Sequence, residues 1–112
     1  MSCLFNSIGG CLGKSGSDVR REICEFMNMH QDMDINDMPL KQWIEISENR
    51  SATEYITAMQ SAAVWGGGLE LTAASNLYNI SIIVNFGNVL IRVNEDKPKV
   101  IRLFYTGSHY YI

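Results

Sequence analysis

The first third of the chain spaces its hydrophobic residues as helices do. Within residues 1–12, apolar side chains recur every three or four positions, although two glycines weaken the pattern. Residues 13–17, rich in Gly and Ser, predict a break, and Ser17 is placed to cap a second helix that fades near His30. The apolar face of this second helix consists of Val19, Ile23, Phe26 and Met27.

The middle of the chain predicts a loop and then further helices. Residues 31–39 are acidic and methionine-rich, which indicates a loop, and residues 40–46 predict a short helical turn. The sequence Ser51-Ala52-Thr53-Glu54 is typical of a capping box and predicts a helix start. After a tight Trp-Gly-Gly-Gly element at residues 65–68, another helix is expected over residues 69–78. The positions expected to be buried in these two helices are Tyr55, Ile56, Met59, Leu71, Ala74, Leu77 and Tyr78.

After this helix the period of the pattern changes from helical to alternating. Asn79 suits a left-handed helix cap, and strands are predicted over residues 80–86, 89–93 and 100–105, with a last short strand at 109–112. Helices that come first and strands that come later indicate an α+β domain, in which helices flank a small central β-sheet.

The strand at residues 80–86 is predicted to be central and buried. Ile82, Ile83 and Val84 form an unbroken apolar run, as expected where both faces of a sheet are covered. Residues 100–104 are rich in β-branched side chains too, so this segment is expected to run beside it.

Composition limits the function classes. The 112 residues suffice for a single domain, 1–112, with one core, and 12 acidic against 9 basic side chains give a net charge of −3. A nucleic-acid-binding protein needs a basic surface, so no nucleic-acid partner is expected. No apolar run approaches the roughly 20 residues that span a bilayer, and no signal peptide is recognisable, so no membrane partner is expected. We expect a monomer.

The chain has three cysteines, Cys3, Cys11 and Cys24. Their number is odd and their spacing is not that of a zinc site, so neither a disulfide framework nor a metal centre is predicted. Without a signal peptide, reduced thiols in the cytoplasm are the better interpretation, and at least one thiol is free for chemistry.

Two short motifs resemble ligand-binding loops but fail on spacing. Gly13-Lys14-Ser15 ends like a phosphate-binding loop, yet Ile8 stands where that motif needs its first Gly. Residues 32–36 begin like a calcium loop, yet Asp37 and Trp43 stand where the loop needs Gly and Glu. A flexible loop and a solvated acidic loop are the better interpretations.

Cys3 and His109 are candidates for a nucleophile and its base. Cys3 begins a predicted helix, where aligned backbone dipoles favour the nucleophilic thiolate. His109 follows a Gly-containing turn near the other end of the chain, and such pairs meet in space rather than in sequence. On these facts alone, a structural cysteine and a structural histidine are the simpler interpretation.

Five sequence blocks, in their order along the chain, favour the catalytic interpretation. The blocks are Cys3-Leu4-Phe5-Asn6-Ser7, residues 19–26, Tyr55-Ile56 with Met59, residues 65–71 and Gly107-Ser108-His109-Tyr110. Together they resemble the ovarian-tumour (OTU) family of cysteine proteases, whose best-known members are deubiquitinases. The resemblance extends over essentially the whole chain, and its Trp-Gly-Gly-x-x-Glu-Leu block is the most specific part.

The resemblance implies an OTU-like cysteine protease fold and a role for individual residues. Cys3 matches the nucleophile and His109 the general base, so we expect their side chains to lie within reach of each other. The backbone around Ser2 and Cys3 would form the oxyanion hole. The loop near the channel for the substrate's glycine tail would be formed by Trp65, Gly66 and Gly67. A core position for Trp65 is an equally good interpretation, and Glu70 is expected to anchor the first turn of the following helix.

Two departures from the family pattern predict weakened activity. The family has an Asp three residues before the nucleophile, whereas this chain begins at Met1, which indicates a shortened version of a longer enzyme or a degenerate domain. The family also has Asp or Asn two residues after the His, where this chain has Tyr111. A tyrosine cannot offset an imidazolium as a carboxylate does, so His109 is expected to lack its usual orienting partner.

The resemblance thus implies a thiol-dependent hydrolase that needs no cofactor or metal. Its substrates would be isopeptide or peptide bonds after the C-terminal tail of ubiquitin or a ubiquitin-like modifier. The alternative is a catalytically degenerate OTU-fold module that binds ubiquitin-like partners. So small a version would suit a viral or intracellular bacterial source, and we expect it in the cytoplasm, that of the host if the source is a virus.

Overall fold

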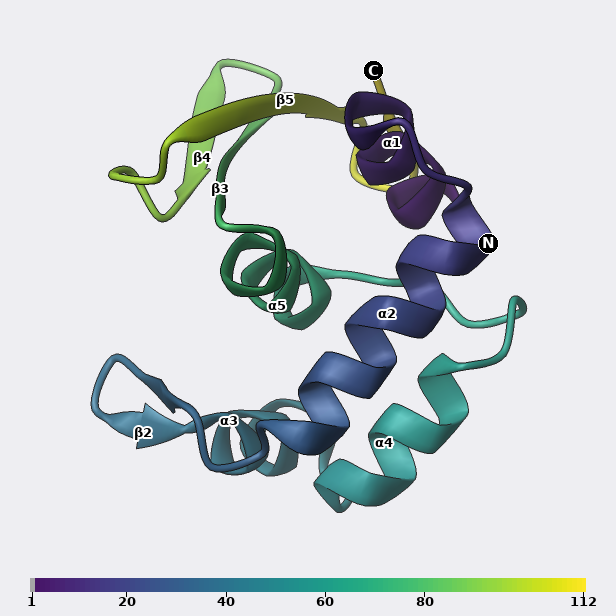
Figure 1. Ribbon diagram of the computed structural model, residues 1–112, viewed down its shortest axis with the longest axis vertical. Coiled ribbons are helices and arrows are strands. Elements are labelled where there is room, and N and C mark those ends of the chain that lie inside the picture. The colour runs from purple at the N-terminus through teal and green to yellow at the C-terminus, as the bar shows by residue number, and fades with distance from the viewer. Residues whose placement is uncertain (1) are drawn as a thin grey trace.

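The computed structural model describes residues 2–112 (Figure 1). Along this part of the chain, a run of helices is followed by a run of strands, and the same order then repeats. The helices are α1 (Cys3–Leu12), α2 (Gly16–Met29), α3 (Leu40–Glu48), α4 (Ala52–Met59) and α5 (Gly68–Tyr78). The strands are β1 (Asp34–Ile35), β2 (Met38–Pro39), β3 (Ile80–Phe86), β4 (Val89–Val93), β5 (Lys99–Tyr105) and β6 (Tyr110–Tyr111). The α+β class predicted from the sequence is confirmed.

β3 is an inner strand of the main sheet, whose order is β4-β3-β5-β6. It pairs antiparallel with β4 and parallel with β5, and β6 adds antiparallel to β5. In this register Ile82 lies opposite Val93 on one side and Ile101 on the other. The prediction that residues 80–86 form a central strand beside residues 100–104 is therefore confirmed.

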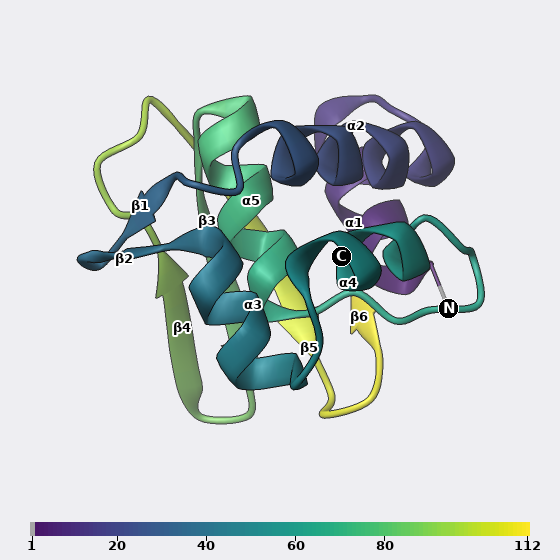
Figure 2. The same cartoon turned by 90° about the horizontal axis from the view of Figure 1, so that it is seen from below.

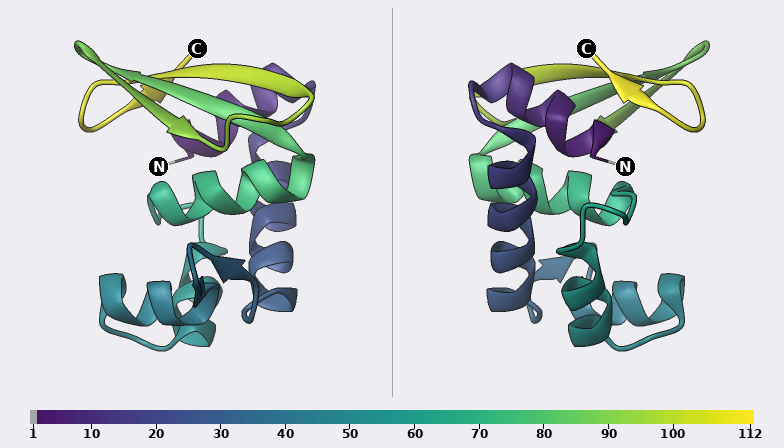
Figure 3. Two further views of the ribbon diagram at one scale, coloured as in Figure 1. Left: turned by 90° about the vertical axis from the view of Figure 1, so that its left-hand side faces the viewer. Right: turned by 90° about the vertical axis from the view of Figure 1, so that its right-hand side faces the viewer.

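The helices lie on one side of the main sheet. Figure 3 shows the sheet as the upper layer with α1 and α5 beneath it, and α3 and α4 farthest away; Figure 2 gives the view from below. α1 contacts β5 and β6, whereas α5 contacts β3 and β4, and α2 packs against α1, α4 and α5. The core lies between these layers, and its largest fully buried side chains include Leu4, Phe5, Ile8, Ile23, Met27, Ile56, Met59, Ile80, Ile82 and Leu103.

The other face of the sheet is more open, which corrects one expectation. Ile82 and Val84 are buried, but Ile83 between them is only half-buried. Val100 and Phe104, on the neighbouring strand, are exposed. Successive side chains of a strand point to opposite faces, so the unbroken apolar run of β3 does not mean burial on both faces.

The turn between α1 and α2 depends on Gly13 and Ser15. Gly13 follows α1 with a φ of 71°, a left-handed conformation that suits glycine. Ser15 is the N-cap of α2, because its Oγ accepts the backbone N–H of Asp18 at 3.1 Å. The expected cap, Ser17, lies instead within the first turn of the helix. Both serines satisfy the sequence preference, and only the backbone geometry selects between them.

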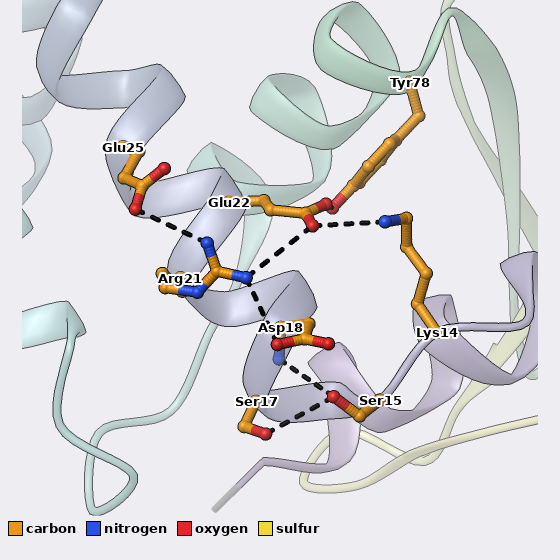
Figure 4. Close-up of polar contacts among 8 residues, drawn as sticks. All are labelled: Lys14, Ser15, Ser17, Asp18, Arg21, Glu22, Glu25 and Tyr78. Atoms are coloured by element: carbon orange, nitrogen blue, oxygen red, sulfur yellow. Dashed lines mark hydrogen bonds and ion pairs between the residues drawn. The ribbon is translucent and has the colours of Figure 1, made fainter.

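Polar contacts on α2 connect this turn to α5 (Figure 4). Lys14 Nζ lies 3.1 Å from a carboxylate oxygen of Glu22, and the other oxygen accepts a hydrogen bond from the Tyr78 hydroxyl at 2.7 Å. These contacts, the one from Tyr78 above all, hold the pKa of Glu22 below its ordinary value. Arg21 pairs with Asp18 on the exposed surface of the same helix. Lys14 therefore has a structural role here.

The acidic segment at residues 31–39 is more ordered than expected. It contains the two-stranded hairpin β1–β2, whose turn residues Asn36 and Asp37 both have positive φ. Trp43 on α3 donates from Nε1 to the carbonyl of Ile35 at 2.7 Å, which fixes the hairpin to the helix. Strands of two residues are too short to produce a recognisable period, so the sequence predicts only a loop.

The starts and ends of α4 and α5 agree with the sequence pattern in most respects. Ser51 Oγ accepts the backbone N–H of Glu54 at 3.2 Å, as the capping-box pattern predicts. Asn79 follows α5 with a φ of 55°, the predicted left-handed cap. Leu77 and Tyr78 are half-buried rather than buried.

No helix within residues 2–112 has the length and apolar character needed to cross a membrane.

Candidate active site

Cys3 is the first residue of α1, as expected. Its thiol is half-buried, and Sγ accepts a hydrogen bond from the backbone N–H of Tyr110 at 3.5 Å. This contact joins the first helix to the last strand. The first N–H groups of an α-helix have no intrahelical acceptor, so the start of α1 offers backbone donors beside the thiol.

His109 lies at the end of a tight turn between β5 and β6. Gly107 in this turn has a φ of 103°, which glycine adopts far more readily than other residues. Thr106 closes the turn, because its N–H donates to the His109 carbonyl at 3.0 Å and its Oγ1 accepts the His109 N–H at 3.1 Å. The predicted strand at residues 109–112 is therefore shorter, since His109 belongs to the turn.

Cys3 and His109 line the same surface pocket. The other residues that line it are Ser2, Asn6, Ser7, Tyr110, Tyr111 and Ile112. A neighbouring pocket is lined by His109 and Tyr110 together with Trp65 and Gly66. The fold thus gathers the two ends of the chain and the loop between α4 and α5, residues 60–67, around His109.

The three predicted channel residues share one pocket but differ in their surroundings. Trp65 is 51% exposed, so its interpretation as a core aromatic is wrong. Gly66 has no room for a side chain, because a Cβ there would lie 2.8 Å from Phe5 and 2.9 Å from Leu4. All three residues line a third and larger pocket of about 560 Å³ at the start of α5. Of the three, only Trp65 and Gly66 also line the pocket that includes His109 and Tyr110.

Ser2 stands at the N-cap of α1 without a capping hydrogen bond from its side chain. Its carbonyl accepts the N–H of Asn6 at 2.7 Å, and its hydroxyl accepts a hydrogen bond from Arg20 Nη2 at 3.3 Å. The backbone of Ser2 and Cys3 borders the same pocket as the thiol and His109. This position suits backbone donors that would face a developing oxyanion.

Within residues 2–112, no acidic side chain hydrogen-bonds to or forms an ion pair with the imidazole of His109. Within residues 2–112, no hydrogen bond or ion pair with a side chain reaches the imidazole, and Tyr111 stacks on Phe104 with ring centroids 5.3 Å apart. Tyr110, on the other face of β6, stacks on Tyr105 at 4.3 Å. Burial raises the pKa of Tyr110 to about 12, so its hydroxyl stays protonated at neutral pH.

Glu70 anchors α5 from a fully buried position. Its carboxylate accepts the backbone N–H of Gly67 at 2.7 Å and the hydroxyl of Tyr55 at 2.8 Å. Burial raises the pKa of Glu70 to about 7, although both hydrogen bonds act in the opposite direction. The anchoring role is confirmed, but the contact with Tyr55 was not foreseen from the sequence.

Sequence reasoning also missed Arg20, a buried cation next to the site. Arg20 is only 4% exposed, and its guanidinium lies 4.2 Å from the ring centroid of Phe5. The sequence does contain a signal, because Arg20 falls at helical spacing with the buried residues Cys24 and Met27.

Within residues 2–112 no group of three or more His, Cys, Asp and Glu side chains is arranged to hold a metal ion.

Comparison with known proteins identifies the class of this domain. The family model of the OTU-like cysteine proteases matches residues 2–111, and the chain therefore belongs to that family. The chain is 34% identical to "Ubiquitin thioesterase Otu1" of Drosophila melanogaster, over 97% of this chain and 31% of that protein. It is 33% identical to "Ubiquitin thioesterase OTU1" of Drosophila pseudoobscura pseudoobscura, over 97% and 30%. The chain thus spans about a third of the length of these curated relatives.

Solved structures share the fold. An OTU domain in complex with ubiquitin superimposes with a TM-score of 0.77 at 21% identity, over 97% of this chain and 61% of that one. The OTUD1 OTU domain gives 0.74 at 18% identity, over 97% and 76%. The viral OTU domain protease from Dera Ghazi Khan virus gives 0.73 at 19% identity, over 97% and 71%. These likenesses confirm the OTU-like fold expected from the sequence blocks.

Proposed function

We propose that this domain is a deubiquitinase, a thiol-dependent hydrolase that cleaves the bond after the C-terminal tail of ubiquitin or a ubiquitin-like modifier. The observation that carries the proposal is the placement of Cys3 and His109 in one pocket, with the thiol held against the backbone of Tyr110. Membership of the OTU-like cysteine protease family and the curated ubiquitin thioesterase relatives support it. We place it in the cytoplasm as a monomer, which suits its free cysteines.

The proposed mechanism begins at the thiol. His109 takes the proton from Cys3, and the thiolate attacks the carbonyl carbon of the last glycine of the tail. Backbone N–H groups around Ser2 and Cys3 hold the negative charge that develops on the carbonyl oxygen. His109 then gives its proton to the departing lysine amine, which leaves a thioester on Cys3. A water molecule that loses a proton to His109 attacks the thioester carbonyl and releases the tail as a carboxylic acid, while Cys3 departs as a thiolate that takes the proton back from His109.

The wall of the second pocket supports an extended substrate tail. Trp65 and Gly66 line the same pocket as His109. Gly66 packs so closely on the side chains of Leu4 and Phe5 that a side chain at position 66 requires either the loop or these two side chains to shift. A tail that ends in two glycines has no side chains to accommodate at its last positions, which suits a site walled by a backbone.

A binding module of the same fold is the second candidate function. The observation that favours it is the environment of His109, whose imidazole has no orienting carboxylate within residues 2–112. Such a module would bind ubiquitin-like partners without turnover. Retention of both Cys3 and His109 in one pocket favours the enzyme over this alternative.

Hydrolysis of ubiquitin carrying a C-terminal fluorophore tests the proposal. We expect measurable release of fluorophore by the parent and none by Cys3→Ala or His109→Ala. Cys11→Ser is the matched control, because Cys11 lies outside both pockets and its replacement should leave the rate unchanged. A folded parent that binds ubiquitin but releases no fluorophore would favour the binding module.

A further inference from the structure

Arg20 makes contacts that link three separate segments of the chain. It stands on α2, and Nη1 donates to the carbonyl of Met59, the last residue of α4, at 2.7 Å. Nη2 donates to the carbonyl of Val64 at 2.9 Å and to the hydroxyl of Ser2 at 3.3 Å. One guanidinium therefore joins the residue before the nucleophile to both ends of the segment that leads to Trp65.

These contacts go beyond what stabilising the core requires. A buried cation is costly unless its donors are paired, and an apolar side chain would fill the same space without that cost. The planar guanidinium, however, can reach Val64 and Ser2 from one nitrogen and Met59 from the other. No apolar residue fixes two backbone carbonyls and a hydroxyl in one geometry.

The segments that Arg20 joins also pack directly on each other. Gly66 lies against Leu4 and Phe5, the two residues that follow the nucleophile in α1. The face of the Phe5 ring lies under the guanidinium of Arg20 at 4.2 Å. The start of α1 and the loop at residues 60–67 thus form one packed unit, with Arg20 on its inner side.

We propose that Arg20 is a positioning residue of the active site, which holds Ser2 and the loop that carries Trp65 and Gly66 in fixed register with Cys3. The inference rests on the proposed function, since it assigns Arg20 to the same catalytic site. Arg20 acts through other residues: it sets the backbone that would face the oxyanion on one side and the wall of the substrate channel on the other. A shift of these groups by about 1 Å is enough to lower the rate of catalysis about 100-fold.

Arg20→Lys is the main test, with Arg21→Lys as its matched control. Lysine keeps the charge, but its single ammonium nitrogen replaces two separate guanidinium nitrogens, so it cannot hold the two carbonyls and the hydroxyl in the same geometry. On ubiquitin carrying a C-terminal fluorophore, we expect kcat to fall about 10- to 100-fold with KM changed less than about threefold. Arg21 is the next residue of the same helix, its side chain is 56% exposed and it pairs only with acidic residues of α2 in the contacts shown. Its replacement should leave kcat unchanged.

Hydrogen exchange of the backbone supplies a readout that does not depend on activity. In Arg20→Lys we expect faster exchange at residues 2–6 and 60–66, and unchanged exchange in α3, which takes part in none of the Arg20 contacts described above. If the parent fails to cleave ubiquitin, the proposed function falls, and faster exchange confined to these two segments still supports the positioning role. If the parent cleaves ubiquitin, an unchanged kcat in Arg20→Lys overturns the positioning role. Unchanged hydrogen exchange in Arg20→Lys overturns it whether or not the parent is active.

Ser2→Ala decides the matter if Arg20→Lys does not fold. This substitution removes only the hydroxyl that Arg20 contacts and leaves the buried cation with its two carbonyls. The proposal requires a fall in kcat of about two- to fivefold with an unchanged thermal midpoint. A kcat equal to that of the parent would overturn the link to the nucleophile.

Discussion

The three cysteines lie in three different environments, and these environments predict their reactivity. A brief iodoacetamide pulse should label Cys3 well before Cys11 and Cys24. Burial raises the pKa of the Cys24 thiol to about 11 and also raises that of Cys11, so neither carries much thiolate at neutral pH. Cys3 is half-buried at a helix N-terminus and borders an open pocket. Peptide mass spectrometry gives the labelled fraction at each site, and equal labelling of all three would contradict this prediction.

In the family pattern, the position of Tyr111 has an acid or amide that orients the histidine. Tyr111→Asn should raise kcat for a fluorogenic ubiquitin substrate, because an amide there can accept a hydrogen bond from the imidazole and fix its tautomer. The native side chain is instead stacked on Phe104. Tyr111→Phe is the matched control, since it keeps the stacking and removes only the hydroxyl, and it should match the parent. A loss of activity in Tyr111→Phe would show that the tyrosine hydroxyl itself orients His109.

At the scale of elements, the start of α5 couples stability to pH through Glu70. Its folded-state pKa of about 7 exceeds the ordinary value of 4.5, so the folded state binds this proton more tightly than the unfolded state does. The associated stability is fully present below pH 4.5 and is lost as the pH rises through about 7. A shift of this size corresponds to a loss on the order of 3 kcal/mol.

Glu70→Gln should remove this dependence while it keeps partners for Gly67 and Tyr55. Urea unfolding of both proteins at pH 5 and pH 8 measures the difference. We expect the free energy of unfolding of the parent to fall more steeply between these pH values than that of the variant. Equal slopes would mean that Glu70 does not titrate in this range.

The two faces of β3 predict unequal effects of the same substitution. Ile82→Asp should unfold the domain, because a carboxylate without a partner in the fully buried inner face costs more than about 4 kcal/mol, a large part of the stability of a domain. Ile83→Asp should lower the thermal midpoint less, since Ile83 is half-buried on the more open face. Circular dichroism during heating compares the two variants. Equal midpoints would show that both faces are covered in solution.

The elements of this fold follow from the sequence wherever the pattern is long. The seven residues of β3 and the fourteen of α2 have a clear period, and Asn79 has the backbone preference of a left-handed cap. The cap of α2 at Ser15 was missed because two serines in the same break satisfy the same preference. Arg20 was missed for another reason. Its acceptors at Met59 and Val64 are backbone carbonyls, whose positions exist only once α4 has packed on α2.

At the scale of the whole molecule, the site depends on the meeting of the two ends of the chain. Cys3 begins α1, and the turn with His109 precedes β6, which contacts α1 and pairs with β5. The sequence blocks singled out these two residues as candidates, but they did not predict the backbone contact from Tyr110 to the thiol. A site assembled in this way is lost with the global fold rather than with one loop.

A site with a reachable thiol but a poorly oriented base should separate adduct formation from turnover. We expect ubiquitin with a C-terminal electrophile to form a covalent adduct with Cys3, while a fluorogenic ubiquitin substrate is hydrolysed slowly. The adduct needs only the thiol and a bound tail, whereas turnover also needs an oriented His109 to protonate the leaving group and to activate water. In the serine-protease triad, loss of the orienting acid lowers kcat by about 10⁴, which sets the scale of the expected deficit.

Gel analysis of the adduct and fluorescence kinetics measure the two steps on the same preparation. Cys3→Ala should form no adduct, and Cys11→Ser should form as much as the parent, because Cys11 borders neither pocket that contains His109. Brisk hydrolysis by the parent would contradict the deficit and would mean that a group other than residue 111 orients His109. A folded parent that binds ubiquitin but forms no adduct would instead assign the site to recognition, because binding requires the pocket beside Trp65 and Gly66 and makes no demand on the thiol.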